Sequence, residues 1–217
     1  HFNCDRIDIF ATAVLRNCSN SHKATAAIEE GIGQRICILS NEEEAHLGYL
    51  GAKLDQDLEE GTMVDIGGGS TELTSIKGGF DLAKTSIPQG SLSSFANHVA
   101  GLMPTQKEVN AITQAFRELA KKEETDVYHC TQLYGIGGSI RSAAKLYGDL
   151  CNNGNRFNYL LPEHIDAILN RYAEDTNAFA HEALRTLPDR IHTLIPGCVI
   201  IREAFKLCDG ERLDICK

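Results

Sequence analysis

Long apolar segments are missing from this chain of 217 residues. None of its apolar runs approaches the ~20 residues that a helix needs to cross a bilayer, so we expect no membrane segment. The first residues, HFNCD, lack the basic stretch and the apolar core of a secretory signal. They also lack an initiator methionine, which favours a piece of a longer protein. The composition, 42% hydrophobic and 24% charged, is that of a soluble globular protein with one large domain or two small ones.

Cysteine pairs with the spacing of zinc ligands are also missing. The chain has eight cysteines, but none of them forms a Cys-x-x-Cys pair, and several, such as Cys37 and Cys198, lie in or beside apolar runs. We interpret them as reduced thiols of a cytoplasmic protein, because disulfides are rare in that compartment. The eight histidines show no ligand spacing either, and we assign them structural or surface positions.

Basic residues are fewer than acidic ones, with 21 Lys and Arg against 30 Asp and Glu. The formal net charge is −9, which argues against general nucleic-acid binding, since phosphate backbones bind to clusters of lysine and arginine. A polyanionic ligand would therefore have to bind in a local basic pocket.

The most informative feature is the stretch from Asp65 to Glu72, DIGGGSTE, which lies between two runs expected to be strands. Three consecutive glycines cost backbone entropy, but they let an anion approach a backbone whose N–H groups point into one concavity. The two flanking carboxylates can hold a hard cation or orient a water molecule. An ordinary hairpin turn would need only one or two glycines with Asn or Asp, so we favour phosphate binding.

Apolar runs and breaker residues predict an α/β fold, in which strands and helices alternate. The polar stretch 55–61 is the best domain boundary, which gives a first domain of residues 1–58 and a second of residues 59–217. The first is expected to contain strands at 7–15 and 35–39 and helices at 21–31 and 40–54. The second is expected to contain strands at 62–66, 71–76, 80–87, 132–136 and 212–216. Its helices are expected at 91–102, 105–123, 140–147, 162–173, 176–187 and 189–207, with a loop at 152–155.

Several charged residues near the start of the chain could have a functional role, but some of them are already explained by a structural one. Ser40 and Glu43 have the spacing of a capping box, and the helix dipole favours acidic residues in a first turn, which accounts for Glu42 as well. Glu44 is not explained by the cap, and its functional and solvated interpretations stay equally open. Arg16 follows the first predicted strand, where a guanidinium suits a phosphate, although a lone arginine is more commonly a surface residue.

A second glycine loop, GIGGS, runs from Gly135 to Ser139 at a predicted strand-to-helix junction. Such a junction suits an anion at the N-terminus of a helix. Ile140 stands where the third glycine of Gly-x-Gly-x-x-Gly belongs, so we do not expect a Rossmann cofactor site.

These segments resemble the Ppx/GppA family, the exopolyphosphatases and guanosine pentaphosphate phosphohydrolases of the actin/Hsp70/sugar-kinase superfamily. The resemblance implies an α/β fold of two ribonuclease-H-like domains around a cleft. The first domain of this chain would be a remnant, and the second would be a ribonuclease-H-like domain with helical additions. The matching segments are FATAVLRNCSN at 10–20, ILSNEEEA at 38–45, DIGGGSTE at 65–72, GGS at 137–139 and DG at 209–210.

The resemblance also implies roles for single residues. Glu44 falls on the catalytic base, which activates water for attack on a terminal phosphorus. Asp65 and Glu72 fall near the divalent metal, Mg²⁺ or Mn²⁺, and Arg16 falls on a phosphate-contacting arginine. Phosphoryl transfer requires chiefly positioning and charge neutralisation, which these residue types provide. The phosphate loops would be formed by Gly67, Gly68, Gly69, Ser70, Gly137, Gly138 and Ser139.

The family's first phosphate loop, approximately Asp-x-Gly-Ser-Asn-Ser, has no counterpart in this sequence. We therefore expect this chain alone to be inactive or poorly active, and its first strand to offer an unpaired edge to a homodimer. The expected ligand is polyphosphate or guanosine penta- or tetraphosphate, and the sequence does not choose between them. One alternative is an ATP-driven kinase or ATPase of the same superfamily, although a kinase needs no glutamate to activate water. Another is a non-catalytic protein that binds a phosphorylated ligand.

Overall fold

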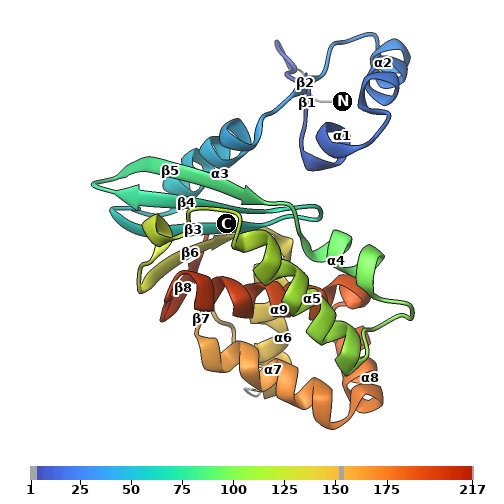
Figure 1. Ribbon diagram of the computed structural model, residues 1–217, viewed down its shortest axis with the longest axis vertical. Coiled ribbons are helices and arrows are strands. Elements are labelled where there is room, and N and C mark those ends of the chain that lie inside the picture. Colours follow the sequence, from blue (N-terminus) through green and yellow to red (C-terminus); the bar gives the residue numbers. More distant parts are fainter. Residues whose placement is uncertain (1–3, 152–153, 217) are drawn as a thin grey trace. The chain divides into compact units, whose positions relative to one another are not determined.

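The computed structural model describes residues 4–151 and 154–216 (Figure 1). The chain divides into two compact units, His1–Glu44 and Ala45–Lys217. This division falls inside helix α3 (Asn41–Asp55), whereas the sequence suggested a boundary near residue 58. Part of the loop predicted at 152–155 lies outside the described residues. No helix that the structure describes is both long and apolar enough to span a membrane.

The first unit contains a parallel pair of short strands and two helices besides the start of α3. Phe10 lies opposite Cys37 in the pair. The helix predicted at 21–31 is confirmed, and its end is set by Gly33, whose φ of +70° allows the left-handed cap. The elements are β1 (Phe10–Ala11), α1 (Ala13–Asn17), α2 (Ser21–Ile32) and β2 (Cys37–Ile38).

The strand predicted at 7–15 is wrong in its extent. Only Phe10 and Ala11 pair as a strand, and a helix begins at Ala13. The residues of that helix, AVLRN, include three good helix formers, and a short apolar run does not reveal its period. The homodimer that we expected to form through this strand stays a prediction. The strand that could pair with a second copy is shorter than expected.

The second unit is built on a six-stranded sheet in the order β5-β4-β3-β6-β8-β7. Its first three strands in sequence form an antiparallel meander, and β6 and β8 continue the sheet parallel to β3. The last strand, β7, pairs antiparallel with β8 and was not predicted. This mixed sheet with its helices is the predicted α/β, ribonuclease-H-like fold. The strands are β3 (Glu60–Ile66), β4 (Thr71–Lys77), β5 (Phe80–Ile87), β6 (Gln132–Ile136), β7 (Tyr159–Leu160) and β8 (Arg212–Ile215).

Helices cover both faces of this sheet, with α3 on one face and the later helices on the other (Figure 1). The central one, α9, is buried along most of its length and packs against α4, α5, α6 and α7. Two predicted helices end earlier than expected, at His98 and Ala120. The helices are α4 (Ser91–His98), α5 (Gln106–Ala120), α6 (Gly138–Cys151), α7 (Pro162–Glu174), α8 (Thr176–Thr186) and α9 (Ile191–Leu207), with short 3-10 turns η1 (Asp126–Tyr128) and η2 (Pro188–Arg190).

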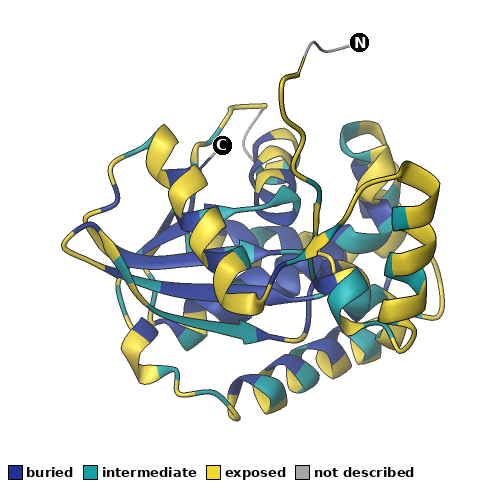
Figure 2. Cartoon of the chain, turned by 90° about the horizontal axis from the view of Figure 1, so that it is seen from above, coloured by how far each residue is buried: buried dark blue, intermediate teal, exposed yellow. Residues whose placement is uncertain are grey.

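The middle strand, β3, contributes side chains to a core on each face of the sheet. Val64 and Ile66 belong to the larger core under α5, α6, α7 and α9, whereas Met63 packs with Tyr49 and Leu58 under α3. This alternation follows from the two-residue period of a strand. Figure 2 shows the resulting concentration of buried residues in the sheet. With both faces covered, the position of the loop that follows β3 is fixed.

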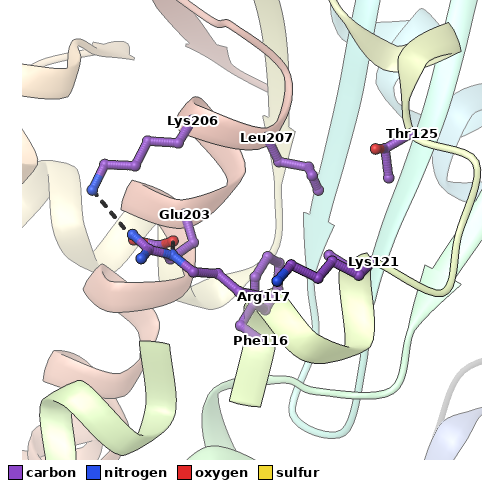
Figure 3. A pocket seen from close by; sticks show the side chains of 8 residues that line it. Phe116, Arg117, Lys121, Thr125, Glu203, Lys206 and Leu207 are labelled. Atoms are coloured by element: carbon purple, nitrogen blue, oxygen red, sulfur yellow. Dashed lines mark hydrogen bonds and ion pairs between the residues drawn. The ribbon is translucent and has the colours of Figure 1, made fainter. Parts of the chain in front are cut away.

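A buried carboxylate joins α5 to α9. Glu203 on α9 is 3% exposed, and Arg117 on α5 donates hydrogen bonds of 2.5 and 3.2 Å to its two oxygens (Figure 3). Lys206 lies 3.4 Å from the same carboxylate. The pair with Glu203 raises the pKa of Arg117 above its usual range. These residues border a cavity of about 360 Å³ that Phe116 and Leu207 also line.

Arg117→Ala should lower the free energy of unfolding, because it removes two hydrogen bonds from a buried carboxylate. A hydrogen bond to a charged group contributes ~1.5–3 kcal/mol, and we expect a loss near the lower end because Lys206 remains beside Glu203. Urea denaturation followed by circular dichroism measures the change.

Arg171→Ala is the matched control. Arg171 on α7 also makes two hydrogen bonds to one glutamate, Glu182, but these side chains are 44% and 35% exposed. Exposed pairs contribute only ~0.2–1 kcal/mol. Equal losses in the two variants would show that the burial of Glu203 adds nothing to the pair.

Candidate phosphate-binding site

The loops that follow β3 and β6 lie at the same edge of the sheet. The two strands are parallel neighbours, with Asp65 opposite Ile136, so both end at that edge. A cavity of about 450 Å³ opens there, which we call the glycine-loop pocket. Such a crevice at the carboxyl ends of neighbouring strands is a common place for ligands in α/β proteins. The residues nominated from the sequence that line it are Asp65, Gly67, Gly68, Gly137, Gly138 and Ser139.

The first glycine loop forms a tight turn whose carbonyl groups are occupied. The amide of Gly67 donates to the carbonyl of Ser70 at 3.0 Å, which closes the turn. The carbonyls of Gly67 and Gly68 accept hydrogen bonds of 2.8–3.0 Å from the first amides of α4. Within residues 4–151 and 154–216, no hydrogen bond uses the amide of Gly68 or Gly69 as a donor. The carbonyl oxygens of Gly67 and Gly68 are therefore already hydrogen-bonded, and the amides of Gly68 and Gly69 are available to an anion.

The second glycine loop passes over the end of β3. A Cβ atom on Gly137 would lie 2.9 Å from the carbonyl oxygen of Ile66 and 3.0 Å from Oδ1 of Asp65. The φ of Gly137 is +102°, a left-handed conformation that side chains rarely adopt. Both facts require glycine at this position. They also bring the N-terminus of α6, which begins at Gly138, next to the first loop.

Arg190 adds a cation that sequence reasoning missed. Its guanidinium lies against Gly138, where an added Cβ would be 2.5 Å from two of its nitrogens. The N-terminus of α6 already carries unpaired amides and a partial positive charge. A guanidinium beside a helix N-terminus is favourable when an anion neutralises both, so this corner of the pocket suits phosphate. The other lining residues that were not nominated are Ile66, Ser91, Leu92, Asp189, His192 and Thr193.

Asp65 and Glu72 are direct partners in the β3–β4 ladder. Asp65 lines the pocket, whereas Glu72 is buried and accepts a hydrogen bond of 2.9 Å from Ser86. Gly69, Ser70 and Glu72 are not among the lining residues. The described residues hold no group of three or more His, Cys, Asp or Glu side chains that fits a metal ion. Two carboxylates still fit Mg²⁺, which usually keeps several waters and takes substrate phosphates as further ligands.

In the first unit, the structure brings Arg16 and Glu44 together. Arg16 donates a hydrogen bond of 2.8 Å to the Glu44 carboxylate and one of 2.7 Å to the carbonyl of Leu39. The side chains of Arg16 and Glu44 are only 16% and 19% exposed. Nε and the second terminal nitrogen of Arg16 are buried and have no hydrogen-bond partner among the described residues. Buried donors without an acceptor are costly, and an anion would satisfy them.

The neighbouring Glu43 has a structural role, as predicted from the capping box. The amide of Ser40 donates to the Glu43 carboxylate at 2.8 Å, and the amide of Glu43 donates to the Ser40 hydroxyl at 3.1 Å. The hydrogen bonds from Ser40, the backbone one foremost, lower the pKa of Glu43 below its usual value. The helix cap therefore accounts for Glu43, and the contact with Arg16 distinguishes Glu44 from it.

Several solved structures share this fold. A Ppx/GppA family member from Aquifex aeolicus matches 98% of this chain and 70% of its own at 21% identity, with a TM-score of 0.76. An exopolyphosphatase-like protein matches 100% and 75% at 20% identity, with a TM-score of 0.82. An exopolyphosphatase from Cytophaga hutchinsonii matches 97% and 70% at 17% identity, with a TM-score of 0.78. At these identities the likeness establishes the fold. The model of the Ppx/GppA phosphatase family matches residues 1–217, and the chain belongs to this family.

Proposed function

We propose that the protein is a phosphohydrolase that removes the terminal phosphate from a phosphoanhydride chain, inorganic polyphosphate or pppGpp. The observation that supports this most is the convergence of two glycine loops and Arg190 in one pocket. Membership of a phosphatase family supports the same reaction class. The exopolyphosphatases among the similar structures favour a substrate with linked phosphates.

The glycine loops and Arg190 bind the phosphate in this proposal. The amide of Gly68, which lines the pocket, and the first amides of α6 donate to its oxygens, and Arg190 neutralises its charge. The amide of Gly69 follows in the same loop and would donate to a phosphate that reaches past the lining residues. These donors are fixed by the fold before the substrate arrives, so they need little reorganisation during the reaction. Preorganised donors of this kind stabilise the charge that builds up on a transferring phosphoryl group.

Asp65 and Glu72 would hold the divalent cation, Mg²⁺ or Mn²⁺, whose charge neutralises the phosphate oxygens when it is bound. Asp65 is the better placed of the two, since it lines the pocket. Glu72 is its neighbour across the ladder and is positioned by Ser86.

Glu44 is the proposed general base. Its carboxylate takes a proton from water, the water oxygen forms a bond to the terminal phosphorus, and the anhydride bond to the rest of the chain breaks. Arg16 orients the carboxylate through one terminal nitrogen, which leaves Nε and the other terminal nitrogen for the phosphate. The two proposed roles of Arg16 therefore use different atoms of one guanidinium.

A kinase or ATPase of the same superfamily, and a non-catalytic phosphate-binding protein, are the competing functions. Phosphate release from the full-length protein, measured in parallel with polyphosphate, pppGpp and ATP, separates them. Hydrolysis of ATP alone would favour an ATPase. Binding without release would favour a non-catalytic role.

Glu44→Gln in the full-length protein should reduce turnover by about 10²–10⁴ while substrate binding is largely kept, since this is the range for losing a general base. Steady-state phosphate release gives kcat and KM. Glu43→Gln is the matched control on the adjacent residue, and it should cost far less turnover because Glu43 serves the cap. Similar losses of kcat in the two variants would mean that this division of roles is wrong.

Arg190→Gln should weaken the binding of tripolyphosphate by roughly tenfold or more, because a hydrogen-bonded charge contact contributes about 1.5–3 kcal/mol. Isothermal titration calorimetry measures the Kd. Lys107→Gln makes the same change in charge at an exposed position of α5 outside the pocket. It should leave the Kd unchanged, and an equal weakening in both variants would argue against a specific role for Arg190.

A further inference from the structure

Most of the charged residues that line a second cavity in the same unit are basic. It has a volume of about 570 Å³ and lies along α6 and the loop that precedes β7. Three of its lining residues, Arg141, Lys145 and Arg156, are exposed cations, and we call them the basic strip. Among the described residues that line this cavity, Asp149 is the one acidic side chain. In a chain of net charge −9, this is a local excess of positive charge.

The basic strip continues from the glycine-loop pocket along α6. That helix begins at Gly138 in the pocket, and Arg141 follows one turn later. At a rise of 1.5 Å per residue, Lys145 lies about 10 Å from Gly138 along the helix axis. The glycine-loop pocket and the second cavity therefore adjoin the same helix.

A hydrogen bond from Lys145 to the end of α8 links the second cavity to the turn that lines the glycine-loop pocket. Lys145 donates a hydrogen bond of 2.8 Å to the carbonyl of Thr186, the last residue of α8. The turn η2 follows shortly after, and its Asp189 and Arg190 line the glycine-loop pocket. A chain-like ligand that starts at Arg190 can thus follow α6 toward Lys145.

Arg156 is held at the far end of the strip by close packing. The loop that carries it crosses α6 at Gly148, where an added Cβ would lie 2.1 Å from the carbonyl oxygen of Asn155. The amide of Gly154 donates to the carbonyl of Gly148 at 2.7 Å. Next to Arg156, the ring of Phe157 packs edge-on against that of Tyr147. The backbone at Arg156 is therefore fixed against the helix.

We propose that the basic strip binds internal phosphates of a linear polyphosphate whose terminal phosphate occupies the glycine-loop pocket. This rests on the proposed function and deepens it, because it selects long chains over pppGpp. Cations about one to two helical turns apart suit a ligand that repeats a negative charge along its length. The triphosphate of pppGpp ends in a nucleoside, so it offers few charges to the strip.

The test compares long-chain polyphosphate with tripolyphosphate as substrates of the full-length protein. Lys145→Gln combined with Arg156→Gln should raise KM for the long chain by roughly 5–20-fold, the range for losing two exposed charge contacts. It should leave KM for tripolyphosphate and kcat for both substrates unchanged. The charge-retaining pair Lys145→Arg and Arg156→Lys should restore KM for the long chain.

Lys121→Gln combined with Lys122→Gln is the matched control, since it removes two exposed cations that directly follow α5. It should leave both KM values unchanged. An unchanged KM for the long chain in the strip variant, with normal turnover of tripolyphosphate, would overturn the inference and leave the proposed function standing. An equal rise in the control would overturn it too, because the effect would then come from net charge. No turnover of either substrate by the unmodified protein would instead overturn the proposed function.

Discussion

The close passage of Gly137 over the end of β3 is the constraint on which the rest of the pocket depends. The parallel register that sets Asp65 opposite Ile136 brings the second loop within 3 Å of the Ile66 carbonyl, measured from the Cβ position of Gly137. Any side chain at Gly137 would push the two loops apart. Because β3 is packed on both faces, the strand cannot shift to accommodate such a change. The separation of the two glycine loops is therefore set by the core of the sheet.

The groups of the pocket that could bind an anion belong largely to the backbone. In a chain of net charge −9, unpaired amides and the N-terminus of α6 supply partial charges that no count of lysine and arginine would reveal. The carbonyls of Gly67 and Gly68, which would repel an anion, are bound by the start of α4. Among the described residues that line the pocket, Arg190 is the one arginine, and Asp65 and Asp189 line it as well. An anion in this pocket would therefore be bound mainly by backbone amides and by one guanidinium.

Most of the second unit follows from its sequence, because its strands and helices have clear periods and glycine-rich ends. The pairing of Asp65 with Glu72 also follows, since a tight turn at 67–70 leaves those two residues opposite each other. The approach of Arg190 to Gly138 does not, because it depends on how α8 and η2 pack against α6. The first unit was harder to predict, since its apolar runs are too short to distinguish strand from helix, as at α1.

Arg16 holds together a unit with little core of its own. Ala13 and Leu39 are its only buried residues within residues 4–44, so side-chain packing contributes little there. Arg16 on α1 contacts Leu39, which follows β2, and Glu44 at the start of α3, and so joins three elements. Removing it would disturb the fold as well as any ligand contact. Successive residues on a helix differ by about 100° in direction, so Glu43 can serve the cap while Glu44 faces Arg16. Glu44→Gln keeps a side-chain oxygen that can accept from Arg16, so it tests the proposed catalytic role with less disturbance of the unit than a change at Arg16.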